Sequence, residues 1–267
     1  ARAPVASPYL VDTHCHLGDA AFDVDRDAVL ARAREAGIGH VVAIGESLAG
    51  SERAVALARG RPGLSATAGV HPHEAREWSP ATATRVRELL AASEVVAVGE
   101  TGLDYHYMHA PRETQRAAFE AQLAFGVELG KPVVVHNRES DADMAAILRN
   151  FGQQPPVVVL HSFSSGAEVW DTGLALNAYF SFSGMITFKN FAHTGRLAVC
   201  PSDRLLLETD SPYLAPVPHR GKRNEPGFVR AVAERAATLR GESPEVLMQR
   251  TTDNARRCFG ARIDSTL

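Results

Sequence analysis

The sequence has few cysteines, no long apolar run and no excess of positive charge. Its three cysteines, Cys15, Cys200 and Cys258, are an odd number without CxxC spacing, which argues against a disulfide framework. No apolar stretch approaches the roughly 20 residues that span a bilayer. Residues 1–8 lack the apolar core of a signal peptide. We therefore expect a cytoplasmic protein that does not bind membranes.

The formal net charge of -3 excludes a protein that coats nucleic acid through a globally basic surface. If nucleic acid binds, it binds at a local site. Metal ions would then supply positive charge that a count of side chains omits.

Eight strand-like runs alternate with helical stretches such as 23–36, 80–92 and 112–129. This alternation, in a chain of 267 residues, predicts an α/β fold of the (β/α)₈ TIM-barrel type, for which about 250 residues are typical. We expect one domain over 1–267, with an N-terminal extension at 1–8, an eighth barrel helix at 226–240 and an extra C-terminal helix at 243–259. The expected strands are 9–17, 40–45, 64–70, 95–100, 132–136, 157–161, 178–183 and 204–210.

Histidine or a carboxylate ends five of these runs. Active sites of such barrels gather at the C-terminal ends of the strands. Imidazoles mixed with carboxylates, without thiolates, indicate a catalytic divalent metal rather than a structural zinc. Any one of these residues could instead be a satisfied core residue, but five strands that end this way favour a metal. The predicted ligands are His14, His16, Glu100, His136, His161 and Asp210.

Six such ligands exceed the three of a usual mononuclear catalytic site, so we expect two divalent ions, Mg²⁺, Mn²⁺ or Zn²⁺, with Glu100 as the bridge. Asp12 and Glu208 share the inward face of their strands with the ligands. We expect them to hydrogen-bond to ligating histidines. For both, a buried acid without a role at the metal is the alternative.

Other residues near the strand ends are predicted to hold a substrate. Arg138 lies two residues after His136, so both side chains are on the same face of the strand, and its guanidinium can donate two hydrogen bonds to a phosphate. His71 follows the third strand. The loop 215–226 carries basic residues where barrels often bind phosphate, with a solvated surface loop as the alternative. Tyr105 and Tyr107 suit base stacking, although packing is as plausible for either. The substrate-binding residues expected are His71, Arg138, Arg220, Lys222 and Tyr105.

Eight segments carry a likeness to known proteins: 11–17, 69–72, 99–105, 136–138, 160–163, 208–213, 215–226 and 252–254. Together they resemble one family, the TatD metal-dependent deoxyribonucleases, and its YcfH-like branch. The likeness runs from about residue 9 to residue 259. It implies a metal-dependent hydrolase barrel with the six ligands named above. It also implies that Glu100 takes the place of a carbamylated lysine found in related hydrolases.

The expected activity is hydrolysis of DNA phosphodiester bonds by a metal-bridging hydroxide, with Asp210 as general base and Glu100 as the second catalytic residue. We expect a monomeric 3′–5′ exonuclease that prefers single-stranded DNA or 3′ ends, with a role in DNA repair. The first alternative is a hydrolase of the same fold acting on a small-molecule or aminoacyl ester or amide. A non-catalytic metal-binding protein is the second, and the intact ligand set argues against it.

Overall fold

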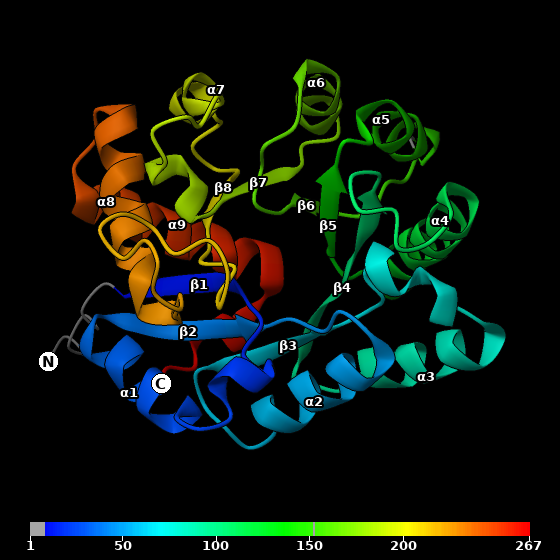
Figure 1. Cartoon of the computed structure of the whole chain (residues 1–267), viewed down its shortest axis with the longest axis horizontal. Helices are drawn as coiled ribbons and strands as arrows, with labels where there is room; N and C mark the ends of the chain where they lie inside the picture. Colours follow the sequence, from blue (N-terminus) through cyan, green and yellow to red (C-terminus); the bar gives the residue numbers. More distant parts are fainter. Residues whose placement is uncertain (1–8, 152) are drawn as a thin grey trace, which may run out of the picture.

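The computed structural model describes residues 9–151 and 153–267, so the predicted N-terminal extension lies outside the described residues. Eight parallel strands form one sheet in chain order, and helices surround it (Figure 1). The strands are β1 (Leu10–Cys15), β2 (Ile38–Ala43), β3 (Leu64–Ala68), β4 (Val95–Asp104), β5 (Val133–Arg138), β6 (Val158–Leu160), β7 (Tyr179–Phe182) and β8 (Leu205–Leu207).

The sheet closes where β8 meets β1. Cys15 and Ser211 form a parallel bridge. The amide of Asp210 donates to the carbonyl of His14 at 2.8 Å, and the amide of His16 donates to the carbonyl of Ser211 at 2.8 Å. The predicted (β/α)₈ barrel is thereby confirmed, and this junction lies directly beside two of the predicted metal ligands.

The helices begin and end at residues suited to those positions. Ser243 caps α9 by accepting a hydrogen bond from the amide of Val246 at 3.3 Å, with Pro244 at the first helical position. Gly130 ends α4 at a φ of +62°. The helices are α1 (Arg26–Glu35), α2 (Leu48–Ala58), α3 (Pro80–Leu90), α4 (Arg112–Leu129), α5 (Asp141–Asn150), α6 (Ala167–Ala175), α7 (Thr194–Val199), α8 (Val229–Arg240) and α9 (Pro244–Phe259). Short 3₁₀ segments are η1 (Ala20–Phe22), η2 (Pro72–Glu77), η3 (Gly184–Thr187), η4 (Pro226–Phe228) and η5 (Ala261–Asp264).

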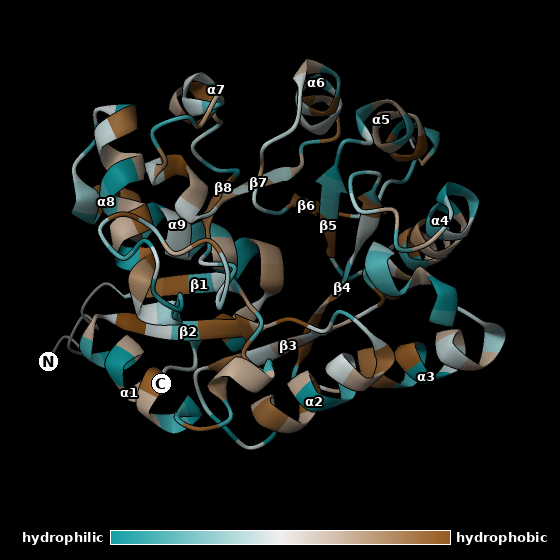
Figure 2. Cartoon of the chain, viewed as in Figure 1, coloured by the Kyte–Doolittle hydropathy of each residue, from teal (hydrophilic) through white to brown (hydrophobic). Residues whose placement is uncertain are grey.

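Apolar side chains fill the space on both sides of the strands, and brown, hydrophobic segments recur along β1 and β2 in Figure 2. One core lies between strands and helices. A second core includes Val11, Val96 and Val134 together with Ala255 and Phe259 of α9. The C-terminal helix therefore packs against the N-terminal ends of the strands and leaves their C-terminal ends for the site.

Most elements differ from the expected bounds by one to three residues, and β4 differs by four. β4 continues past Glu100 to Asp104 because Gly102 lets it pair closely with β5. A Cβ on Gly102 would lie 1.9 Å from the carbonyl oxygen of His136, and its φ is +141°. The last barrel helix begins at Val229, since the preceding residues form the 3₁₀ segment η4. Within residues 9–151 and 153–267, no helix combines the length and apolarity needed to cross a membrane.

Candidate metal centre

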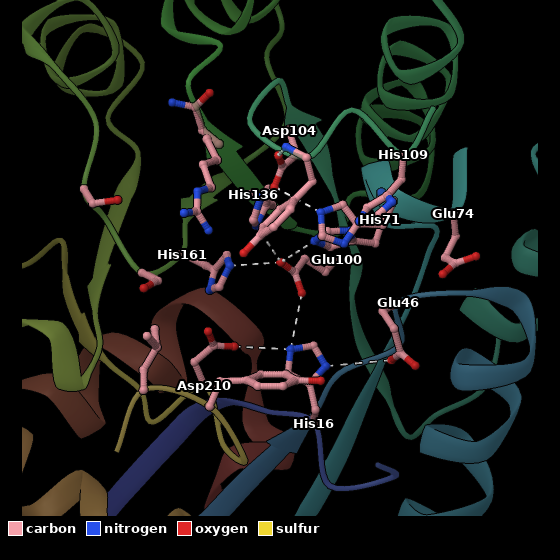
Figure 3. A pocket seen from close by; sticks show the side chains of 18 of the residues that line it. His16, Glu46, His71, Glu74, Glu100, Asp104, His109, His136, His161 and Asp210 are labelled. Carbon is pink, nitrogen blue, oxygen red and sulfur yellow. Dashed lines mark hydrogen bonds and ion pairs between the residues drawn. The ribbon is translucent and has the colours of Figure 1, made fainter. Parts of the chain in front are cut away.

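The six predicted ligands meet at the C-terminal end of the barrel, beside a pocket of about 740 Å³ whose lining Figure 3 shows. His14 is buried, and the other five line the pocket. Their positions follow from the strands: His14 in β1, His16 just after it, Glu100 in β4, His136 in β5, His161 just after β6 and Asp210 after β8. Strands far apart in the sequence thus bring their terminal residues to one place.

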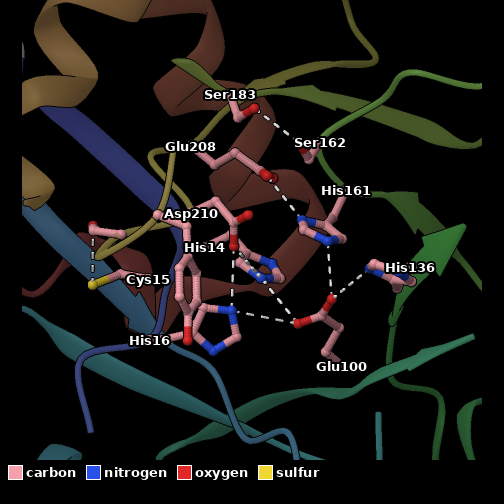
Figure 4. Close-up of polar contacts among 12 residues, drawn as sticks. His14, Cys15, His16, Glu100, His136, His161, Ser162, Ser183, Glu208 and Asp210 are labelled. Atoms are coloured by element: carbon pink, nitrogen blue, oxygen red, sulfur yellow. Dashed lines mark hydrogen bonds and ion pairs between the residues drawn. The ribbon is translucent and has the colours of Figure 1, made fainter. Parts of the chain in front are cut away.

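The two carboxylate oxygens of Glu100 face two different pairs of imidazoles (Figure 4). Its Oε2 lies 3.2 Å from Nε2 of His14 and 3.6 Å from Nε2 of His16. Its Oε1 lies 3.2 Å from Nδ1 of His136 and 2.9 Å from Nε2 of His161. A carboxylate placed in this way can hold one cation with each oxygen.

Asp210 completes the group on the side of His14 and His16. Its Oδ1 lies 3.2 Å from Nε2 of His16 and 3.5 Å from Nε2 of His14. The residue takes a φ of +58°, a left-handed conformation that aspartate tolerates better than most residues. The backbone hydrogen bond from Asp210 to His14 across the barrel closure holds this conformation in place.

Unpartnered polar atoms show that the group suits a bound cation. Nδ1 and Nε2 of His14 and Oε2 of Glu100 are buried and have no hydrogen-bond partner in the described structure. Such atoms are costly unless something binds them. Two ligands placed 2.0–2.2 Å from one tetrahedral ion lie roughly 3.3–3.6 Å apart. The separations around Glu100 and Asp210 are close to these values, so the residues fit divalent ions.

Two of the ligand histidines each contact a further carboxylate through the ring nitrogen that faces away from Glu100. Oε1 of Glu208 lies 2.8 Å from Nδ1 of His161, and Oδ2 of Asp104 lies 2.9 Å from Nε2 of His136. With an ion bound, each carboxylate would accept the ring N–H and leave the lone pair of the other ring nitrogen to bind the ion beside Glu100. Glu46 stands behind His16 at 3.8 Å from Nδ1, a longer contact of the same kind.

Mutual contacts, rather than burial, set the charge in this cluster. Burial alone would raise the pKa of Glu100, but His161 and His14 hold that pKa well below its usual range. Burial opposes protonation of His161 and His16, yet nearby carboxylates raise the pKa of His161 well above its usual value and that of His16 to about 10. The carboxylates therefore require positive charge, which protonated imidazoles or bound cations can supply.

Asp12 does not meet the expectation of a hydrogen bond to a ligating imidazole. Its Oδ1 accepts from the amides of Thr209 at 2.8 Å and His14 at 3.3 Å, and its Oδ2 accepts from the hydroxyl of Thr209 at 2.5 Å. Burial raises the pKa of Asp12 to about 8. The alternative of a buried acid satisfied by nearby groups is the one found, because the β1–β8 junction presents amide donors to it.

Two of the five predicted substrate-binding residues line the pocket, namely His71 and Arg138. Tyr105 lies outside the lining, and its hydroxyl donates to Asp143 at 2.6 Å. Arg220 also lies outside, since its guanidinium packs over Phe188 and donates to a backbone carbonyl of its own loop.

Lys222 is exposed and likewise lies outside the lining. The loop 215–226 therefore folds against its surroundings instead of turning its basic residues into the pocket. Contact of its residues or of Tyr105 with a longer substrate stays a prediction.

Sequence reasoning missed several residues of the site. Asp104 was overlooked because β4 was expected to end at Glu100, although both residues share one strand parity. Tyr213 follows the candidate ligand Asp210 by three residues; its ring centroid lies 5.7 Å from that of His16, and it lines the pocket. Glu46 and His109 also line it. Neither carries a local signal, because their loops reach the pocket only in the folded barrel.

Comparisons with known proteins point to one family. A family model described as "TatD related DNase" matches residues 11–260. The "Uncharacterized metal-dependent hydrolase YcfH" of Escherichia coli is 43% identical over 255 residues, which is 94% of this chain and 96% of that protein. The "3'-5' ssDNA/RNA exonuclease TatD" of Edwardsiella piscicida is 40% identical over 257 residues, which is 94% of this chain and 99% of that protein.

A solved structure supports the same assignment. YJJV, a TatD homologue from Escherichia coli, superposes with a TM-score of 0.88 at 28% identity, covering 94% of this chain and 97% of that one. The range 11–260 that the family model matches contains the positions of all six candidate ligands. The chain belongs to the TatD family of metal-dependent hydrolases.

Proposed function

We propose that the protein is a divalent-metal-dependent 3′–5′ exonuclease acting on single-stranded nucleic acid, with DNA as the first substrate to test. The observation that carries the proposal is the position of Glu100 between two imidazole pairs at an open pocket. A relative that is 40% identical bears the name of a 3′–5′ exonuclease of single-stranded DNA and RNA. Two metal ions are a recurrent device for hydrolysing phosphodiesters.

We propose two ions with Glu100 as their shared ligand. His14, His16 and Asp210 would hold the first ion, on the side of Oε2. His136 and His161 would hold the second, on the side of Oε1. Mg²⁺, Mn²⁺ and Zn²⁺ are the candidates, because mixed imidazole and carboxylate sites accept each of them according to availability.

When bound, such ions lower the pKa of a water molecule and neutralise charge on a phosphoryl group. Asp210 borders the pocket and would take the proton of the attacking water as its oxygen bonds to phosphorus. The bond from phosphorus to the leaving oxygen breaks in the same displacement. Arg138 lines the pocket and would orient a phosphate oxygen through its guanidinium.

The charge of the lining supports a second candidate function, hydrolysis of a small-molecule or aminoacyl ester. Asp19, Glu46 and Glu74 line the pocket in addition to the ligand carboxylates. Among the described lining residues, Arg138 is the one with a permanently positive side chain. A polyanion would thus depend on the ions for attraction, whereas a neutral or cationic ester would not.

Metal-stripped protein should be tested on 5′-labelled single-stranded DNA and RNA, with Mg²⁺, Mn²⁺ or Zn²⁺ restored separately. Glu100→Ala removes the shared ligand. Glu234→Gln is the matched control, since Glu234 is exposed on α8 and pairs with Arg230 at 3.4 Å. Metal-dependent shortening from the 3′ end by the wild type and the control, but not by Glu100→Ala, is the expected result.

Absence of cleavage with every metal, while the protein still binds ions, would refute the nuclease proposal. Small aryl and aminoacyl esters would then be the substrates to test. The salt dependence of binding separates the two candidates as well. A polyanionic substrate should lose affinity steeply as salt rises, and a small neutral ester should not.

A further inference from the structure

His71 faces the same carboxylate of Glu100 as the ligand histidines, but the hydrogen bond at its other ring nitrogen runs in the opposite direction. Its Nε2 lies 3.5 Å from Oε1 of Glu100, and His71, Glu100 and His136 form one of the clusters whose donor atoms lie within 4.8 Å of one another. Distance alone would therefore admit His71 as a further metal ligand. The hydrogen bond at its other ring nitrogen decides between a ligand and a donor.

In a histidine that binds a metal, the second ring nitrogen carries a proton and donates it to a carboxylate, carbonyl or water. His161 and His136 follow this rule through Glu208 and Asp104. With an ion bound, each of them would therefore present a nitrogen lone pair to that ion.

His71 breaks the rule because its Nδ1 accepts a hydrogen bond. The donor is the backbone amide of His73, at 3.0 Å, as His71 caps the 3₁₀ segment η2. A backbone amide always donates, so Nδ1 must carry the lone pair and the neutral ring carries its proton on Nε2. Pro72 fixes the turn that makes this contact. The pocket therefore receives an N–H from His71 instead of a lone pair.

That N–H is available to a ligand. Its distance of 3.5 Å from Oε1 of Glu100 is longer than the 2.7–3.2 Å usual for an N–H···O hydrogen bond. His71 lines the pocket, and its ring centroid is 4.5 Å from that of His136. It thus lies beside the imidazole pair proposed to hold the second ion.

We propose that His71 is a catalytic residue that donates its Nε2–H to a non-bridging oxygen of the scissile phosphate and does not bind metal. This inference rests on the proposed phosphodiesterase function. Negative charge grows on the phosphoryl oxygens as the displacement proceeds, and a preoriented donor stabilises it. Because the backbone of η2 fixes the ring, the donor needs no reorganisation at that moment.

Two substitutions separate a donor from a ligand. His71→Ala removes the N–H, and kcat should fall about 10²- to 10³-fold with little change in KM, as when one oxyanion donor is lost. His71→Gln places an amide N–H near the same point, and we expect its kcat to be at least about tenfold higher than that of His71→Ala. Both variants should bind as much Mn²⁺ as the wild type, whereas His136→Ala should bind less.

The tautomer can be measured without any substrate. Long-range ¹H–¹⁵N correlation spectra of the metal-loaded protein should show His71 protonated at Nε2, with Nδ1 as an acceptor. A proton on Nδ1, or loss of metal in His71→Ala, would overturn the inference and make His71 a ligand. Wild-type kcat in His71→Ala would also overturn it.

Kinetics should be run on both an oligonucleotide and bis(p-nitrophenyl) phosphate. If the wild type cleaves neither, the proposed function fails, and the phosphate contact fails with it. If the wild type cleaves them and His71→Ala cleaves them equally well, only the role of His71 fails.

Discussion

Replacing Glu208 with glutamine tests whether the carboxylate behind a ligand histidine strengthens metal binding. Glu208 is fully buried, and its Oε1 lies 2.8 Å from Nδ1 of His161. Glu208→Gln keeps an oxygen that can accept this hydrogen bond but removes the charge. The contact thus changes from a charge-assisted hydrogen bond to a neutral one at nearly constant shape.

Two estimates of the effect overlap. A hydrogen bond to a charged group contributes about 1.5–3 kcal/mol and a neutral one about 0.5–1.5 kcal/mol, a difference of roughly 1–1.5 kcal/mol. Loss of a hydrogen-bond partner behind a ligand usually weakens metal binding about 10- to 100-fold, or about 1.4–2.7 kcal/mol. We therefore expect Glu208→Gln to bind Mn²⁺ or Zn²⁺ about tenfold more weakly.

Calorimetric titration of metal-stripped protein, with a competing chelator for tight sites, measures this affinity. The exposed Glu234→Gln on α8 is the control and should bind as the wild type does. Circular dichroism should accompany the titration, because Oε2 of Glu208 lacks a partner and a buried amide there costs stability as well. Unchanged affinity in a folded Glu208→Gln protein would refute the reasoning.

Three further predictions concern the buried His40 of β2, the contact between β4 and β5, and the proton acceptor. Burial lowers the pKa of His40 from 6.5 to about 4, so between these values the unfolded chain binds a proton that the folded chain does not. The free energy of unfolding should therefore fall by about 3 kcal/mol more in the wild type than in His40→Gln as the pH drops from about 7 to 4. Urea titrations at both pH values measure this, and an identical pH dependence would contradict it. Gly102→Ala places a Cβ 1.9 Å from the carbonyl oxygen of His136 at a φ of +141°, and should cost about 3 kcal/mol or more; an unchanged melting temperature would show that β4 can move. Asp210→Asn should lower kcat at least about 10²-fold if Asp210 takes the proton. Metal analysis with steady-state kinetics tests this, and a fully active, metal-replete variant would remove the role.

The outline of the fold was accessible from local patterns. Most strands are short and largely apolar, and the helices have recognisable ends, as Gly130 and Ser243 illustrate. Such signals depend on neighbours in the sequence, so they can be identified without knowledge of the fold. The bounds were less accessible. β4 extends to Asp104 because Gly102 permits a close approach to β5, and that approach is a contact between distant segments.

The sequence alone determined the barrel and the six candidate ligands, because parallel strands of one barrel present their C-terminal ends together. Only the tertiary structure decided how those residues are oriented. It placed Asp104 behind His136, turned Asp12 toward backbone amides, and folded Arg220 away from the pocket. Hydrogen bonds and packing between residues far apart in the chain set each of these, and no local pattern encodes them. The same holds for His71, whose tautomer follows from one backbone amide in η2.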